Sequence, residues 1–163
     1  MDWKPWLILL HVAGGFTFAL AHGVSAFTAL KLRGERDPVR VTALLDLSKF
    51  SLPVSDLAIL VILASGIAAG FVGGYWDRLW IWVSIGVLVF LFIFMSVRGV
   101  QHNDAIRHAL GEAGFYDNKK TPTPQADSAE LARLLDSPRA IELAAVGGIG
   151  LLVLLWLMVV KPF

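Results

Sequence analysis

The stretch from Trp6 to Leu32 is almost wholly apolar, and it most constrains what this chain can fold into. A helix needs about 20 mainly apolar residues to cross the hydrocarbon core of a bilayer, and this stretch is long enough. It nevertheless contains two histidines, His11 and His22. By helical geometry both imidazoles are expected on one stripe, roughly 16 Å apart along the axis. Polar side chains inside a membrane span are costly, so they suggest a functional hypothesis.

The apolar character extends over the rest of the chain. Charged residues make up 17% of it and the mean hydropathy is +0.68, whereas a soluble domain carries about 25% charged residues. The sequence therefore predicts an all-α fold, a four-transmembrane-helix antiparallel bundle with short amphipathic interfacial helices. We expect a single integral membrane domain over 1–163, in which short loops make sequential spans neighbours. The predicted spans are about 5–30, 51–71, 79–97 and 139–160, with a polar segment at 98–138.

The segments between the spans also have a helical pattern. Residues 41–50 form either a short interfacial helix or the first turns of the second span. Beyond Arg98 the sequence still favours helix, so the third span is expected to continue past the membrane as a polar extension. A linker at 114–128 contains two Thr-Pro pairs, and Ser128 at its end is a candidate N-cap for a short amphipathic helix.

Basic residues are concentrated in two of the three connections. The segments 31–50 and 98–139 together hold eleven lysines and arginines, whereas the remaining turn and the two termini hold three. Short loops rich in Lys and Arg stay on the cytoplasmic side of a membrane. We therefore expect 31–50 and 98–139 to be cytoplasmic and both termini to lie outside.

With that orientation, several polar side chains are predicted near the cytoplasmic side of the bundle. Charges inside a bundle pair with one another or line a wet cavity, so these side chains are candidates for one polar cluster. Its members are His22, Ser25, Asp56, Arg98 and Glu142. The alternative is that the charged members only mark the interface or extend toward water from the span ends.

The two histidines of the first span admit three hypotheses. Neutral imidazoles can bond across helices and so hold a bundle together. Alternatively, His11 and/or His22 are axial ligands of haem b, and Gly14 and Gly15 make room for the macrocycle. The other spans contain no partner histidine, and no polar neighbour of His11 is predicted from its own chain, in contrast to His22. The third hypothesis is a small transporter or proton relay; it uses His22, Asp56 and Glu142.

Other residue types narrow the chemistry further. The chain has no cysteine, which excludes disulfides, iron–sulfur clusters and thiolate metal sites. His102 and His108 are not at the i, i+4 spacing of a helical metal pair and are expected on a solvated helix end. Small residues at four-residue spacing let helices approach closely. Glycines predicted to pack in this way are Gly66, Gly70, Gly74, Gly147 and Gly148.

Three motifs carry a resemblance to a known family. They are Leu10-His11-Val12 with Gly14-Gly15, then His22-Gly23, and then the segment 44–48 (LLDLS) before the second span. Together they resemble a bacterial family of predicted four-span integral membrane proteins of unknown function, which is loosely similar to copper-resistance D-type membrane proteins. The resemblance implies a four-span fold in a bacterial cytoplasmic (inner) membrane and brings no established activity. Copper ligands of the preferred Cys and Met type are missing or scattered here.

The sequence thus predicts a non-enzymatic integral membrane protein. We expect a small accessory or structural subunit that contacts membrane lipid and packs as a homo-oligomer or within a larger membrane complex. No feature points to a nucleic-acid partner. The haem and relay hypotheses stay open as alternatives.

Overall fold

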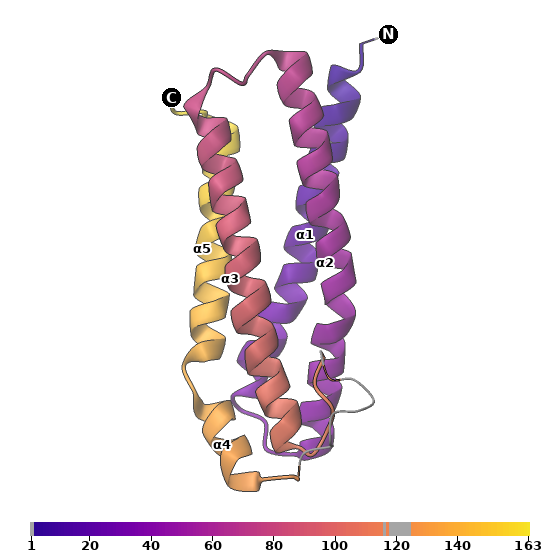
Figure 1. Cartoon of the computed structure of the whole chain (residues 1–163), viewed down its shortest axis with the longest axis vertical. Coiled ribbons are helices and arrows are strands. Elements are labelled where there is room, and N and C mark those ends of the chain that lie inside the picture. Colours follow the sequence, from indigo (N-terminus) through magenta and orange to yellow (C-terminus); the bar gives the residue numbers. More distant parts are fainter. Residues whose placement is uncertain (1, 116, 118–124) are drawn as a thin grey trace.

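The computed structural model describes residues 2–115, 117 and 125–163, and this part of the chain is all-helical (Figure 1). Four of its helices are long and apolar enough to cross a membrane, which confirms the predicted fold class. The two Thr-Pro pairs of the expected linker lie outside the described residues. The helices are α1 (Lys4–Leu32), α2 (Pro38–Gly73), α3 (Leu79–Ala109), α4 (Ser128–Asp136) and α5 (Arg139–Val160).

The helix ends follow from local chemistry. The α2 helix begins at Pro38, where a missing N–H costs nothing, and the Asp37 side chain caps it by accepting the Val39 N–H at 3.0 Å. Residues 41–50 are therefore the first turns of α2 and do not form a separate helix. The α3 helix continues to Ala109, which confirms the predicted polar extension of the third span. Asp127, rather than Ser128, caps α4, because its carboxylate accepts two backbone N–H groups.

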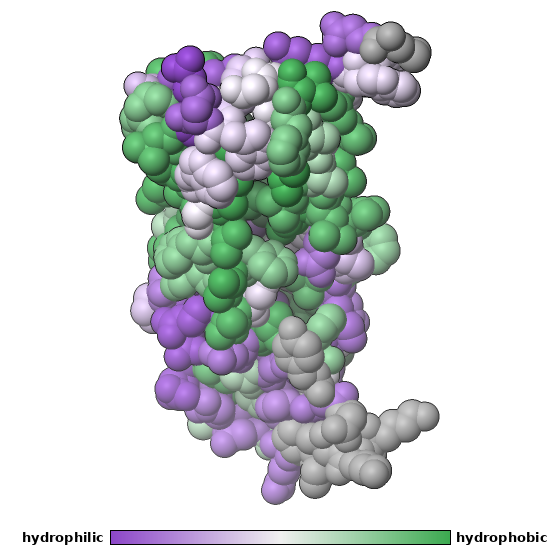
Figure 2. Space-filling model, turned by 45° about the horizontal axis from the view of Figure 1, so that its top comes forward, coloured by the Kyte–Doolittle hydropathy of each residue, from purple (hydrophilic) through white to green (hydrophobic). Residues whose placement is uncertain are grey.

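The four long helices run side by side along the long axis of the molecule (Figure 1). Both termini and the α2–α3 turn lie at one end, and α4 lies at the other. The α1 helix packs closely along α2 and also contacts α5, which packs along α3. Figure 2 shows hydrophobic residues over the middle of the visible face and hydrophilic ones toward both ends. This arrangement is that of a multi-pass membrane protein.

The consecutive helices α2 and α3 lie apart over most of their length and pack together mainly near α4, so the expectation that all sequential spans are close neighbours was wrong for most of this pair. The reason lies in the turn between them. The Trp76 ring contacts Phe71 of α2 at 5.1 Å and Trp82 of α3 at 5.4 Å between ring centroids. A bulky aromatic side chain therefore stands between the two helix ends and separates them.

At the α4 end, α2 and α3 are joined through a small apolar core. The buried Arg107 of α3 donates to Asp46 of α2 at 2.6 Å and to Glu112 at 3.0 Å. Glu112 also accepts a hydrogen bond from Thr42 of α2 at 2.6 Å. The core beneath these contacts consists of Leu32, Val41, Leu45, Ile106, Ala109, Leu131, Leu134 and Leu135.

Candidate functional site

His11 lies between α1 and α2. Its Nδ1 is 2.9 Å from the backbone oxygen of Ile62, and since a carbonyl only accepts, Nδ1 carries the proton and donates. The Ser65 hydroxyl is 3.3 Å from the same nitrogen. The ring lies over Gly66, where a Cβ would come within 2.9 Å of the His11 Cε1. His11 therefore fills a space that only glycine leaves open on the surface of α2.

His22 lies between α1 and α5 in the same way. Its ring covers Gly147 of α5, where any Cβ would overlap the imidazole. Phe18, one turn earlier on α1, stacks on the ring with centroids 5.9 Å apart and an interplanar angle of 22°. The His22 Nε2 is buried and has no hydrogen-bond partner within the described part of the chain. The two imidazoles thus pack against glycines on two different helices.

The sequence predicted polar neighbours for His22 and none for His11, and the structure shows the opposite. His11, for which no polar neighbour was predicted, bonds to α2, whereas the Nε2 of His22 has no partner among the described residues. The prediction was wrong because it placed residues by depth along the spans. Depth does not show which neighbouring helix faces the stripe, and α1 lies between α2 and α5.

The predicted polar cluster does not assemble as one unit. Ser25 bonds to Ser51 of α2 at 2.6 Å, and Ser51 donates to the Ser48 carbonyl at 2.7 Å. Arg98 of α3 pairs with Glu142 of α5 at 3.4 Å, with both side chains about half exposed. Because the members lie on different faces of four helices, they form separate contacts. Ser48 and Ser51 were not identified from the sequence as partners of Ser25, although their three-residue spacing places them on one side of α2.

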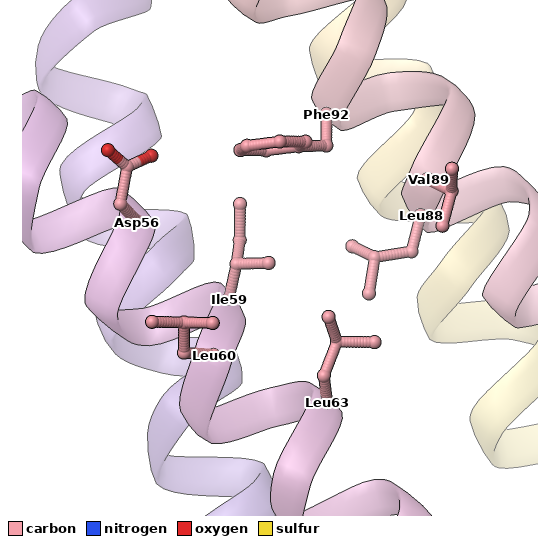
Figure 3. Close-up of a pocket in the computed structure, with 7 residues that line it drawn as sticks. All are labelled: Asp56, Ile59, Leu60, Leu63, Leu88, Val89 and Phe92. Carbon is pink, nitrogen blue, oxygen red and sulfur yellow. The ribbon is translucent and has the colours of Figure 1, made fainter.

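Asp56 stands apart from all of these groups. It is exposed on α2, and no hydrogen bond or ion pair reaches it from the described residues. It borders a crevice of about 360 Å³ between α2 and α3, which Figure 3 shows with Asp56 and Phe92 at one end. We call this the α2–α3 crevice; its lining residues are Asp56, Ile59, Leu60, Leu63, Leu88, Val89 and Phe92.

Some of the glycines contact a side chain of another segment, and others contact none among the described residues. A Cβ at Gly14 would lie 3.1 Å from Ile62, and one at Gly70 would lie 3.1 Å from the Trp76 ring. Gly74 has a φ of +65° and ends α2, so it makes a turn rather than a helix contact. Gly15 and Gly148 have nothing within 4 Å of such a Cβ among the described residues. The packing role predicted for Gly74 and Gly148 was therefore wrong within one chain.

The two histidines of the α3 extension also differ. His108 is partly exposed, and its Nε2 lies 2.8 Å from a carboxylate oxygen of Asp117. His102 is buried, with a side-chain nitrogen, Nδ1, that has no partner in the described ranges. The expectation of a solvated helix end was wrong for His102, because the short helix α4 packs against this part of α3. Within the described residues, no group of three or more His, Cys, Asp or Glu side chains is placed to hold a metal ion.

The residues as they are arranged give haem b no support. The His11 ring is held against Gly66 and the His22 ring against Gly147, and both residues are half-buried between neighbouring helices. No histidine lines the α2–α3 crevice. A second crevice of about 460 Å³ lies along α1 and α2, and it also has no histidine in its lining.

Comparison with protein-family models, with curated proteins and with solved structures gives no match for this chain.

Proposed function

We propose that this chain is a non-enzymatic integral membrane protein, a small accessory or structural subunit that packs with itself or with a larger membrane complex. The observation that carries the proposal is the place of the two imidazoles. His11 and His22 each cover a glycine of a neighbouring helix. Polar side chains used in this way act as packing groups that hold membrane helices together.

The relay hypothesis receives less support from the geometry. His22 lies between α1 and α5, Asp56 borders the crevice between α2 and α3, and Glu142 pairs with Arg98. No hydrogen bond among the described residues joins any two of these three groups. A proton path needs such bonds or a wet cavity between its members.

The outward surface of the bundle supports association. Only 11% of the apolar, membrane-spanning stretch of α1 is buried inside the chain. Large apolar side chains such as Phe16, Leu20 and Phe27 are 70–76% exposed. These surfaces suit lipid and partner helices alike, because the hydrocarbon core is as apolar as either.

We also infer a membrane and an orientation. The excess of Lys and Arg in 31–50 and 98–139 supports a cytoplasmic position for both segments, with both termini outside. The described residues of these two segments lie at the α4 end of the molecule, away from both termini (Figure 1). The motif resemblance around His11 and His22 supports a bacterial cytoplasmic membrane.

Single-cysteine cross-linking in native membranes tests the proposal directly, because the natural chain has no cysteine. Leu20→Cys, Phe71→Cys and Leu152→Cys place a thiol on exposed positions of three helices. We expect at least one of them to form a dimer or a defined adduct with a partner subunit. The matched control is Ala21→Cys, beside Leu20 but buried, which should form none. A strictly monomeric native mass and no adduct at any position would contradict the proposal.

A further inference from the structure

Asp56 is the feature of the membrane-embedded part that the proposed function leaves unexplained. Counted from the start of the predicted second span, it lies about 7.5 Å along α2 toward the bilayer centre. Ionisable groups at such positions almost always pair or face a wet cavity. Nearby basic side chains are engaged elsewhere. Lys49 lies over the Phe115 ring, and Arg107 pairs with Asp46.

The rest of the crevice is apolar and continuous with Asp56. Leu63 lies about two helical turns deeper on α2 than Asp56, or ~10.5 Å along the axis. On the antiparallel α3, Phe92 lies at the Asp56 end and Leu88 lies deeper (Figure 3). A bound molecule therefore meets a carboxylate and an aromatic ring at one end and only aliphatic side chains beyond them.

This combination matches one class of ligand. A carboxylate attracts a cation, and an aromatic ring adds an attraction that is best known for quaternary ammonium groups. The aliphatic part of the crevice can pack against an alkyl chain as lipid tails do, so the preference for a cation comes from the charged and aromatic end. We propose that the α2–α3 crevice binds an amphiphilic alkylammonium cation, with its nitrogen at Asp56 and Phe92 and its chain along Ile59, Leu63 and Leu88.

The size of the crevice favours one alkyl chain over a helix of another protein. It holds about 360 Å³, at the lower end of the range for small-molecule pockets. Two turns of a helix about 10 Å wide would fill roughly 850 Å³, more than the total empty volume of about 710 Å³ in the crevice. A second copy seated here through a two-fold axis along the membrane normal would bring both Asp56 carboxylates to the same depth in one contact without supplying a cation to either.

Equilibrium binding of tritiated dodecyltrimethylammonium to the protein in lipid nanodiscs tests the proposal. The competitor is the uncharged analogue in which a carbon atom replaces the nitrogen. We expect saturable binding to the intact protein, weak competition by the analogue, and at least roughly tenfold weaker binding to Asp56→Asn. Asp77→Asn in the α2–α3 turn is the matched control, because this exposed acid lies at the other end of the molecule. It should bind like the natural protein.

A second variant keeps the test independent of how well Asp56→Asn folds. Phe92→Leu preserves the apolar lining and removes only the ring, and should weaken binding about twofold to fivefold. Equal binding of the charged and uncharged amphiphiles would overturn the proposal, as would full binding by Asp56→Asn. A cross-link from Leu60→Cys to a neighbouring polypeptide would show a protein helix in the crevice and would also overturn it. The association test above uses other surfaces, so the two proposals can fail separately.

Discussion

Substitution of Gly147 by alanine tests whether the His22 ring occupies the surface of α5. A methyl group at this position overlaps the imidazole, so the ring or the helix has to shift. Overpacking of this kind costs about 1–3 kcal/mol. Alanine also favours helix over glycine by about 1 kcal/mol, which offsets part of that cost. We expect Gly147→Ala to lower the free energy of unfolding by about 0–2 kcal/mol.

The adjacent Gly148 provides the matched control. It lies in the same helix, and nothing among the described residues comes within 4 Å of a Cβ built there. Gly148→Ala therefore gains the helix propensity without the overlap, and should raise the free energy of unfolding by up to about 1 kcal/mol. The informative quantity is the difference between the two variants, about 1–3 kcal/mol.

A double-mutant cycle assigns that difference to His22. In a His22→Ala background the ring is gone, so Gly147→Ala should no longer destabilise the protein. Reversible unfolding in mixed micelles, followed by circular dichroism, gives the four free energies. If Gly147→Ala and Gly148→Ala have equal effects in both backgrounds, His22 does not pack against α5 and the reasoning is refuted.

Three further predictions concern contacts elsewhere in the bundle. His11→Leu removes the hydrogen bond to α2 and should cost about 1 kcal/mol in the same unfolding assay; an unchanged stability would contradict that contact. Arg107→Leu removes the pair with Asp46, which joins α2 to α3 beside the apolar core that also contains α4. Loosening this core should accelerate amide hydrogen exchange in α4, and unchanged exchange would exclude a role for the pair in holding α4. The pKa of Asp117 lies below its usual value because the Gly114 N–H, and secondarily His108, bond to its carboxylate. Its stabilising contribution is therefore present above the usual pKa and lost as pH falls through the lowered one, and an NMR titration midpoint at or above the usual value would contradict this.

The fold was predictable because hydropathy and length act on whole segments. Apolar blocks of sufficient length leave few alternatives to membrane-spanning helices. The helical pattern of the polar sequence after Arg98 also correctly indicated that α3 continues past the apolar span, and it ends at Ala109. The exact cap of α4 was less certain, because Asp127 and Ser128 are adjacent and both are good N-cap residues. Such errors move a boundary by one residue without changing the architecture.

The candidate site was less predictable, because it depends on which helices meet. Helical periodicity predicts that His11 and His22 share one stripe of α1, but it does not show that α2 receives one imidazole and α5 the other. Glycine spacing indicated close approach at Gly66 and Gly147, but not that a side chain rather than a backbone fills the space. The separation of α2 from α3 follows from the position of the Trp76 ring, which no pattern in the sequence shows.

We infer that the imidazoles of α1 are packing groups rather than cofactor ligands. An optical absorption spectrum of the protein purified from its own membranes tests this most directly. We predict a spectrum without a Soret band for the natural chain. A Soret band that disappears in His11→Ala or His22→Ala would contradict it.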